Sequence, residues 1–213
     1  MTSRFSLTLL AAATAVLLSS CGSHSVAVVP KSNWLPAAPG AKPQVPGPSA
    51  ELVATSAGKP RDRHGMPVYR FNERRRVVRT TAYTCSEADH LIYGSKNATG
   101  TPLRYTNHVR SAAADWSFYP VGTTFRIKGL PYLYVVDDYG SALTGTGTVD
   151  LYKPNKGVMN LWGRRNVELT IVQWGSFTRS AEILKDRTRF AHCRQMLANI
   201  VRQQPRLSHM VYR

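Results

Sequence analysis

The feature that most constrains the fold of this 213-residue chain is a series of short β-type segments between residues 77 and 174. These segments are rich in β-branched and aromatic residues, and turns that contain glycine follow several of them. They are 77–84, 108–113, 123–128, 132–138, 148–152 and 167–174. Six short strands in fewer than a hundred residues favour a small closed barrel. A helical turn is expected at Asn155–Trp162, so the sequence predicts a mainly β module with one short inserted helix.

The first 20 residues predict that the chain is exported. A short basic start ends at Arg4, and residues 5–18 form an apolar run that is too short to span a bilayer comfortably. The small residues that follow, with Cys21 immediately after them, resemble a bacterial lipobox, in which Cys21 is diacylated and becomes the mature N-terminus. The alternative is an ordinary signal peptide with a chance cysteine. Because Gly22, and not Asp, follows the cysteine, we expect an outer-membrane lipoprotein that faces the periplasm.

Proline and charge distinguish the flanking arms from the β module. Residues 21–68 are rich in proline and show no hydrophobic period, which predicts an extended tether. The chain has 28 Lys and Arg against 12 Asp and Glu, a net charge of +16, and most of the excess lies on the two arms. Such a charge favours binding to polyanions. Because an exported chain has little access to nucleic acid, we expect anionic wall polymers or lipid, and no nucleic acid, as partners.

The C-terminal arm changes from strand to helix periodicity. Apolar residues recur at a helical spacing over 178–203, which predicts one amphipathic helix, with a basic tail, that packs on the barrel. A membrane-surface or wall-binding face is the alternative use of this helix. In an oxidising periplasm, Cys85 and Cys193 could form a disulfide that joins this helix to the loop after the first strand.

Three aspartates stand out by their context, namely Asp115, Asp138 and Asp150. Asp138 and Asp150 flank the same glycine-rich loop, so we expect both to lie near one end of the barrel. Carboxylates that are brought together repel each other, which raises the pKa of one of them and lets it donate a proton near neutral pH. The alternative is that these aspartates only cap turns or hold structural hydrogen bonds. The histidines show no metal-ligand spacing, so we predict no metal or other cofactor.

Six motifs follow one another along the β module. They are Thr81–Thr84, Ala98–Pro102, Asp115 with Tyr119–Thr123, Val136–Leu143, Val149–Tyr152 and Trp162–Arg165. Taken together, they resemble the 3D domain, which is named for its three aspartates and is a double-psi β-barrel related to the C-terminal part of MltA-type lytic transglycosylases. The resemblance implies a six-stranded double-psi β-barrel over residues 77–174, with a short inserted helix and a C-terminal α-helix.

The same resemblance implies cleavage of the β-1,4 bond between MurNAc and GlcNAc in peptidoglycan glycan strands, without added water. Asp150 matches the family's catalytic acid, which protonates the leaving oxygen and then accepts the proton of the sugar's C6 hydroxyl as a 1,6-anhydro ring closes. Asp138 would keep that acid protonated, and Asp115 would support the site from the neighbouring loop. The candidates for sugar contacts are Tyr83, Thr99 and Thr101.

Two of the chain's departures from the family bear on the site. The family usually has Asp-Thr-Gly-Gly-Ala-Ile where this chain has Asp138–Leu143. In the MltA-type enzymes a second domain forms the other wall of the glycan groove, whereas the tether occupies that position here. A protein partner could complete the groove. The alternative to an enzyme is a non-catalytic peptidoglycan-binding lipoprotein, held at the membrane by its lipid anchor.

Overall fold

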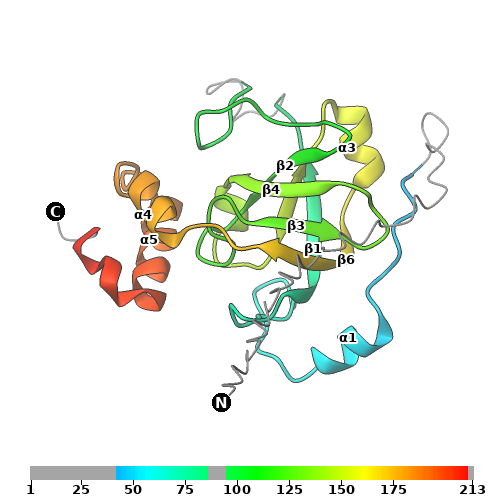
Figure 1. The fold of residues 1–213 in the computed structure, drawn as a ribbon, viewed down its shortest axis with the longest axis horizontal. Helices are drawn as coiled ribbons and strands as arrows, with labels where there is room; N and C mark the ends of the chain where they lie inside the picture. The colour runs from blue at the N-terminus through cyan, green and yellow to red at the C-terminus, as the bar shows by residue number, and fades with distance from the viewer. Residues whose placement is uncertain (1–41, 86–94, 211–213) are drawn as a thin grey trace, which may run out of the picture. The chain divides into compact units, whose positions relative to one another are not determined.

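Six strands close into a barrel in the computed structural model, which describes residues 42–85 and 95–210 (Figure 1). The strands are β1 (Arg75–Tyr83), β2 (Val109–Ala114), β3 (Thr124–Ile127), β4 (Leu133–Asp138), β5 (Val149–Tyr152) and β6 (Arg165–Gln173). Their order around the barrel is β1-β5-β2-β4-β3-β6. The pairs β1–β5 and β2–β4 are parallel, and the other four pairs are antiparallel. This closed, mixed barrel confirms the predicted mainly β fold class and agrees with a double-psi arrangement.

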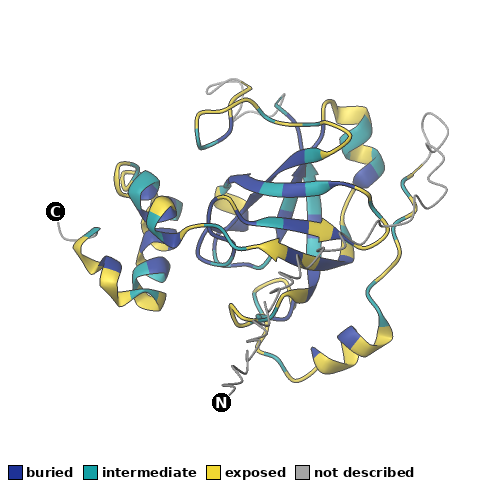
Figure 2. Ribbon diagram, in the orientation of Figure 1, coloured by how far each residue is buried: buried dark blue, intermediate teal, exposed yellow. Residues whose placement is uncertain are grey.

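The barrel interior is a packed core, and burial runs along the strands (Figure 2). The fully buried interior side chains include Phe125, Tyr134, Val136, Leu151 and Leu169. Burying a side chain of this size stabilises the fold by about 1.5–3 kcal/mol relative to leaving it exposed. Because successive residues of a strand point to opposite faces, the residues between them face outward. A substrate would therefore bind on the outer face of the barrel or at one of its ends.

The short inserted helix is present as α3 (Lys156–Trp162). The side chain of Asn155 accepts a hydrogen bond from the backbone N–H of Val158 at 3.0 Å, which caps the start of the helix. The helix ends at Gly163, whose φ of 61° lies in the left-handed region that favours glycine. A single 3₁₀ turn, η1 (Ser141–Leu143), follows β4.

Residues 42–68 pack on the barrel, whereas the sequence predicted an extended tether over residues 21–68. Helix α1 (Ala50–Thr55) buries Leu52 in a small cluster that also contains Met66 and a residue of β1. A six-residue helix with one buried apolar side chain leaves no hydrophobic period. For this reason the pattern of the sequence did not reveal the helix or its packing.

Polar contacts fix the same segment to β6. The backbone N–H of Ser49 donates to Glu168 at 3.0 Å, and Arg75 donates to the same carboxylate at 2.9 Å. Burial alone would raise the pKa of Glu168, but these bonds outweigh it and lower the pKa to about 2. Residues 1–41, which include the predicted signal peptide and Cys21, lie outside the described part of the chain.

The C-terminal arm forms two helices, α4 (Phe177–Lys185) and α5 (Ala191–Gln203), where the sequence predicted one helix over 178–203. A turn over 186–190 separates them, and η2 (Pro205–Met210) follows α5. Two residues of the turn are half-buried at positions that fit the helical spacing. The sequence pattern therefore continues through the turn and does not show that the helix ends there. The helices share one apolar core with the barrel, through Ala181, Leu184, Met196, Leu197 and Ile200. Among residues 42–85 and 95–210 there is no helix with both the length and the apolar character that crossing a membrane requires.

Cys85 and Cys193 are both free, so the predicted disulfide is not formed. The hydroxyl of Tyr152 donates to Cys85 Sγ at 3.8 Å. Cys193 is fully buried on α5 beside Tyr139, and burial raises the pKa of its thiol. Each thiol therefore packs against a different tyrosine, and Cys193 points into the core instead of toward the end of β1.

Gly175 connects β6 to α4 at a point where the backbone comes very close to the loop before β3. A Cβ atom at this position would overlap the carbonyl oxygens of Pro120 and Val121. The close approach lets Gly175 N donate to Thr123 Oγ1 at 3.1 Å and Ser176 N donate to Val121 O at 3.0 Å. The attachment of the two C-terminal helices thus depends on a residue without a side chain.

We expect Gly175→Ala to destabilise the protein by about 1–3 kcal/mol, because the clash is with main-chain atoms that cannot rotate away. Urea denaturation followed by tryptophan fluorescence measures this loss. Gly58→Ala is the matched control, since an added Cβ there meets no atom within 4 Å. Equal unfolding midpoints for the two variants would show that the close approach is not needed.

Candidate active site

A row of polar residues crosses the outer face of neighbouring strands. Thr81 of β1 pairs with Asp150 of β5. Asp150 in turn pairs with Ala113 of β2, which pairs with Asp138 of β4. Paired residues place their side chains on the same face, and this is the outer face because the residue after Asp150, Leu151, is fully buried in the core. The structure thus brings Asp138 and Asp150 into one row, separated by a single strand.

A β-bulge turns two successive carboxyl groups toward this face. The register between β2 and β4 shifts between Ala112 and Ala113, which leaves Asp137 as an extra residue beside Asp138. The side chain of Asp137 accepts a hydrogen bond from Ser111 Oγ at 2.7 Å, and Ser111 shares the face of Ala113 because alternate residues of a strand do so. Without the bulge, adjacent residues would point to opposite faces. We refer to Asp137, Asp138 and Asp150 as the carboxyl row.

Asp138 is buried and accepts hydrogen bonds from three segments of the chain. Tyr83 Oη donates to Oδ2 at 3.2 Å, while the backbone N–H groups of Ala98 and Tyr139 donate to Oδ1 at 3.1 and 3.0 Å. The pKa of Tyr83 lies well above its ordinary value, first because the phenol is buried and then because the carboxyl row lies nearby. Tyr83 therefore remains a phenol that donates to Asp138.

Asp150 differs from the other two members of the row in its exposure. It is half-buried, whereas Asp137 and Asp138 are 5% and 6% exposed. Thr81 Oγ1 donates to Asp150 Oδ1 at 2.7 Å, which fixes the orientation of the carboxyl group. Asp150 is thus the member of the row that a ligand can reach most easily.

Asp115, the third aspartate singled out by the sequence, lies apart from the row and is fully buried. Its Oδ1 accepts from the backbone N–H and the hydroxyl of Ser117, both at 2.7 Å, and its Oδ2 accepts from Gly145 N at 2.6 Å. Burial raises the pKa of Asp115, and these bonds partly oppose that rise. Its carboxyl group anchors the glycine-rich loop that joins β4 to β5, and substrate cannot contact it.

Thr99 and Thr101 lie in a turn that closes over the Asp138 end of the row. The side-chain oxygen of Asn97 accepts from Thr99 N at 3.0 Å, Thr99 Oγ1 at 2.7 Å and Thr101 N at 3.1 Å, which holds the turn. Ala98 of the same turn donates to Asp138. Thr101 is exposed and Thr99 is half-buried, so both hydroxyl groups lie at the edge of the site.

Asp137 is a site residue that the sequence analysis did not single out. Its Oδ1 is buried and has no hydrogen-bond partner among the described residues. Burial is the main cause that raises the pKa of Asp137 to about 6, and the charge of Asp138 adds to it. Two adjacent aspartates in a strand normally point to opposite faces, so only a signal for the bulge could have found Asp137, and the sequence carries none.

Lys153 is the second residue that the sequence analysis missed. It follows β5 directly, is only 3% exposed, and its Nζ lies 4.4 Å from the ring centroid of Trp162. Burial, with the charges of Arg110 and Arg165, lowers the pKa of Lys153 to about 7, while Asp150 opposes this shift. A lysine after a strand is usually solvated, so its type and position gave no signal.

The site therefore consists of three carboxyl groups, a tyrosine and a hydroxyl-bearing turn on the outer face of a closed barrel, with the buried Lys153 directly after β5. Among residues 42–85 and 95–210, no group of three or more His, Cys, Asp or Glu side chains is arranged to hold a metal ion. The arrangement suits proton transfer to or from a bound molecule at Asp150.

A family model described as the 3D domain matches residues 110–173. The matched residues include Asp115, Asp137, Asp138 and Asp150. The match supports the 3D domain family for this part of the chain. No curated protein matches the chain. β1, which supplies Thr81 and Tyr83 to the site, lies outside the matched residues.

We expect Asp137→Asn to alter the pH dependence of stability. Because the pKa of Asp137 is raised from 3.8 to about 6 on folding, native stability falls as the pH rises through this range. Asparagine cannot ionise, so the variant should gain up to about 3 kcal/mol relative to the native protein above pH 6, and should have no such advantage below about pH 4. Urea denaturation between these pH values measures the difference.

Asp186→Asn, in the exposed turn between α4 and α5, controls for the loss of a carboxyl group as such. Parallel stability profiles for the native protein and Asp137→Asn would contradict the raised pKa.

Proposed function

We propose that this chain acts on the bacterial cell wall as a lytic transglycosylase-like lipoprotein, which cleaves the β-1,4 bond between MurNAc and GlcNAc. The observation that carries the proposal is the half-buried carboxyl group of Asp150 on the outer face, in one row with two buried carboxyl groups. The 3D domain occurs in lytic transglycosylase-like proteins, and this supports a role at the cell wall. A relation to the MltA-type enzymes forms part of the same proposal.

In the proposed reaction one carboxyl group is both acid and base. Asp150 donates its proton to the glycosidic oxygen as the bond from the MurNAc C1 atom to that oxygen breaks. The resulting carboxylate then accepts the proton of the C6 hydroxyl of the same MurNAc, whose oxygen attacks C1 and closes a 1,6-anhydro ring. No water is consumed, and Asp150 ends the cycle protonated as it began.

The other two members of the row suit supporting roles. Ordinary glycosidases use a second carboxyl group to activate water or to attack the sugar. Asp138 is buried and accepts three hydrogen bonds, and Asp137 is buried against Ser111, so neither is exposed for attack. Their charge and hydrogen bonds organise the surroundings of Asp150. This division of roles agrees with a reaction that needs only one accessible carboxyl group.

The three candidates for sugar contacts differ in how far they are exposed to solvent. Thr101 is exposed and Thr99 is half-buried at the edge of the site, which supports a role in binding glycan, although Asn97 accepts a hydrogen bond from each hydroxyl group. Tyr83 is only 5% exposed and donates to Asp138, so we propose that it positions Asp138 and does not contact the sugar.

The proposed location is the periplasmic face of the outer membrane, where residues 1–20 have been removed and Cys21 carries the lipid. Peptidoglycan glycan strands are the proposed partner, and a second protein could supply the other wall of the groove. The net charge of +16 supports binding to the anionic wall.

We expect the purified full-length chain to release 1,6-anhydro-muropeptides from murein sacculi, detected by mass spectrometry. Asp150→Asn should reduce this release by about 10²–10⁴-fold, because the amide can neither donate nor accept the catalytic proton. Glu182→Gln on α4 is the matched control, since it removes a surface carboxyl group away from the site.

Two outcomes would contradict the proposed enzyme. If the native chain gives no anhydro products but sediments with sacculi, the chain is the non-catalytic peptidoglycan-binding lipoprotein. If Asp150→Asn and the native chain release equal amounts, another residue is the acid.

The lipid anchor has its own test. We expect Cys21→Ser to abolish incorporation of labelled palmitate and to shift the chain from the membrane to the soluble fraction of expressing cells, because the thiol is the acylation site. Equal labelling of the native chain and Cys21→Ser would exclude Cys21 as the lipidated residue.

A further inference from the structure

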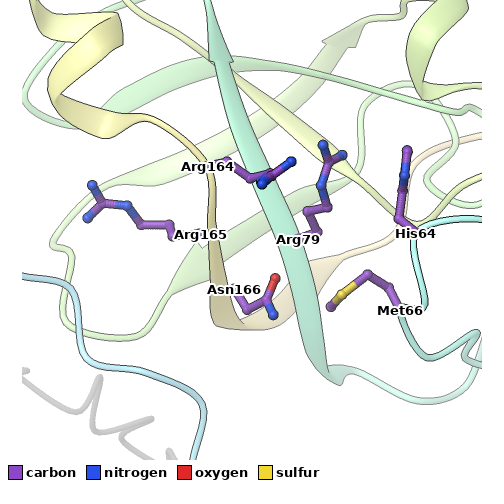
Figure 3. A pocket seen from close by; sticks show the side chains of 6 residues that line it. All are labelled: His64, Met66, Arg79, Arg164, Arg165 and Asn166. Carbon is purple, nitrogen blue, oxygen red and sulfur yellow. The ribbon is translucent and has the colours of Figure 1, made fainter.

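A second feature of the outer face is a cavity of about 430 Å³ that carries several basic groups. It is lined by His64, Met66, Arg79, Arg164, Arg165 and Asn166, which come from the N-terminal segment, from β1 and from the start of β6 (Figure 3). We refer to it as the arginine pocket. Neither the carboxyl row nor the proposed acid lines it.

None of the three arginines forms an ion pair within residues 42–85 and 95–210, and they differ in whether backbone carbonyls already occupy the guanidinium group. Arg79 donates to Thr148 Oγ1 at 3.2 Å, and neither Arg79 nor Arg164 forms an ion pair within residues 42–85 and 95–210. Figure 3 shows the side chains of Arg79 and Arg164 on the same side of β1, while Arg165 extends away from them. Arg165 instead donates to the carbonyl oxygens of Pro43, Leu161 and Trp162. Arg79 and Arg164 are therefore the groups available for a ligand.

The carboxylate near this pocket belongs to Asp62, and backbone N–H groups already donate hydrogen bonds to it. Asp62 accepts hydrogen bonds from the backbone N–H groups of His64, Met66 and Gly147 at 2.8, 3.0 and 3.0 Å. These bonds hold the N-terminal segment over the barrel and so build one wall of the pocket. An acidic ligand group would still meet a net positive charge, because the two available guanidinium groups, those of Arg79 and Arg164, outnumber this one carboxylate.

The arginine pocket adjoins the carboxyl row on the same outer face. Arg79 precedes Thr81 by two residues on β1, so their side chains share a face, and Thr81 pairs with Asp150. Strand geometry puts the Cα atoms of Arg79 and Asp150 about 8 Å apart. The bond from Arg79 to Thr148, two residues before Asp150, joins the two regions directly. A ligand that spans this distance would contact both regions.

We propose that the arginine pocket binds a carboxylate of the peptide stem that MurNAc carries, so that the substrate is peptide-bearing glycan and not bare glycan. This inference rests on the proposed function. The stem begins on the sugar whose bond is cut and bears free carboxylates along its length. Two to three extended residues span about 7–11 Å, which matches the separation of Arg79 from Asp150. Guanidinium groups bind carboxylates through paired, charge-assisted hydrogen bonds.

Binding of a soluble stem peptide to the full-length chain tests the pocket directly. The probe is the tripeptide L-Ala-γ-D-Glu-diaminopimelate, and calorimetry measures its affinity. We expect Arg79→Gln combined with Arg164→Gln to weaken binding at least tenfold. Arg126→Gln is the matched control, because Arg126 is exposed on β3 and, within the described part of the chain, donates only to Pro131 O. If the double variant does not fold, Arg164→Gln alone serves, since Arg164 is exposed and outside any strand.

Cleavage assays separate this inference from the proposed function. The native chain should cut intact glycan strands at least tenfold faster than strands stripped of peptide by an amidase, and the double variant should lose this preference. If the native chain cuts both alike and does not bind the tripeptide, the peptide-stem inference is overturned and the proposed function stands. If the native chain cuts neither but binds the tripeptide through Arg79 and Arg164, the pocket stands and the cutting role fails.

Discussion

The bulge between β2 and β4 is the constraint on which the candidate site depends. One extra residue opposite Ala112 and Ala113 lets Asp137 and Asp138 face outward together, where strict alternation would have sent one of them into the core. An unpaired carboxylate inside the barrel would be too costly to bury, so the irregular pairing also protects the apolar interior. The bulge thus keeps apolar side chains on the face that packs in the core and the carboxyl groups on the outer face.

The site is held by segments that are far apart in the sequence. Tyr83 comes from β1, Ser111 from β2 and Ala98 from a separate turn, yet all three donate hydrogen bonds to the two buried carboxyl groups. Each bond satisfies a buried oxygen and also fixes the position of the segment that donates it. Asp150, which Thr81 orients, is left as the accessible group among side chains that hydrogen bonds hold in place. This preorganisation is what a single-carboxyl reaction requires.

Much of the barrel could be predicted from the sequence, because the six strand segments are rich in β-branched and aromatic residues and turns that contain glycine follow several of them. The bulge could not, since nothing in the run from Leu133 to Asp138 distinguishes a regular strand from a bulged one. The packing of residues 42–68 and the break between α4 and α5 were hidden for opposite reasons. The first segment has too few apolar residues to show a period, and the second keeps its period through a turn. The expected oxidising compartment was the only argument for a bond between Cys85 and Cys193, and the structure instead leaves both thiols free, each beside a different tyrosine.

Gly175 makes the docking of the C-terminal helices depend on one position. The obstacle to any other residue there is the main chain itself, at Pro120 and Val121, so compensating changes among neighbouring side chains cannot remove it. Loss of this docking would expose to water the apolar side chains that Ala181, Leu184 and Ile200 share with the barrel core. Because a large exposed apolar patch favours association with other chains, this glycine also protects the barrel from aggregation.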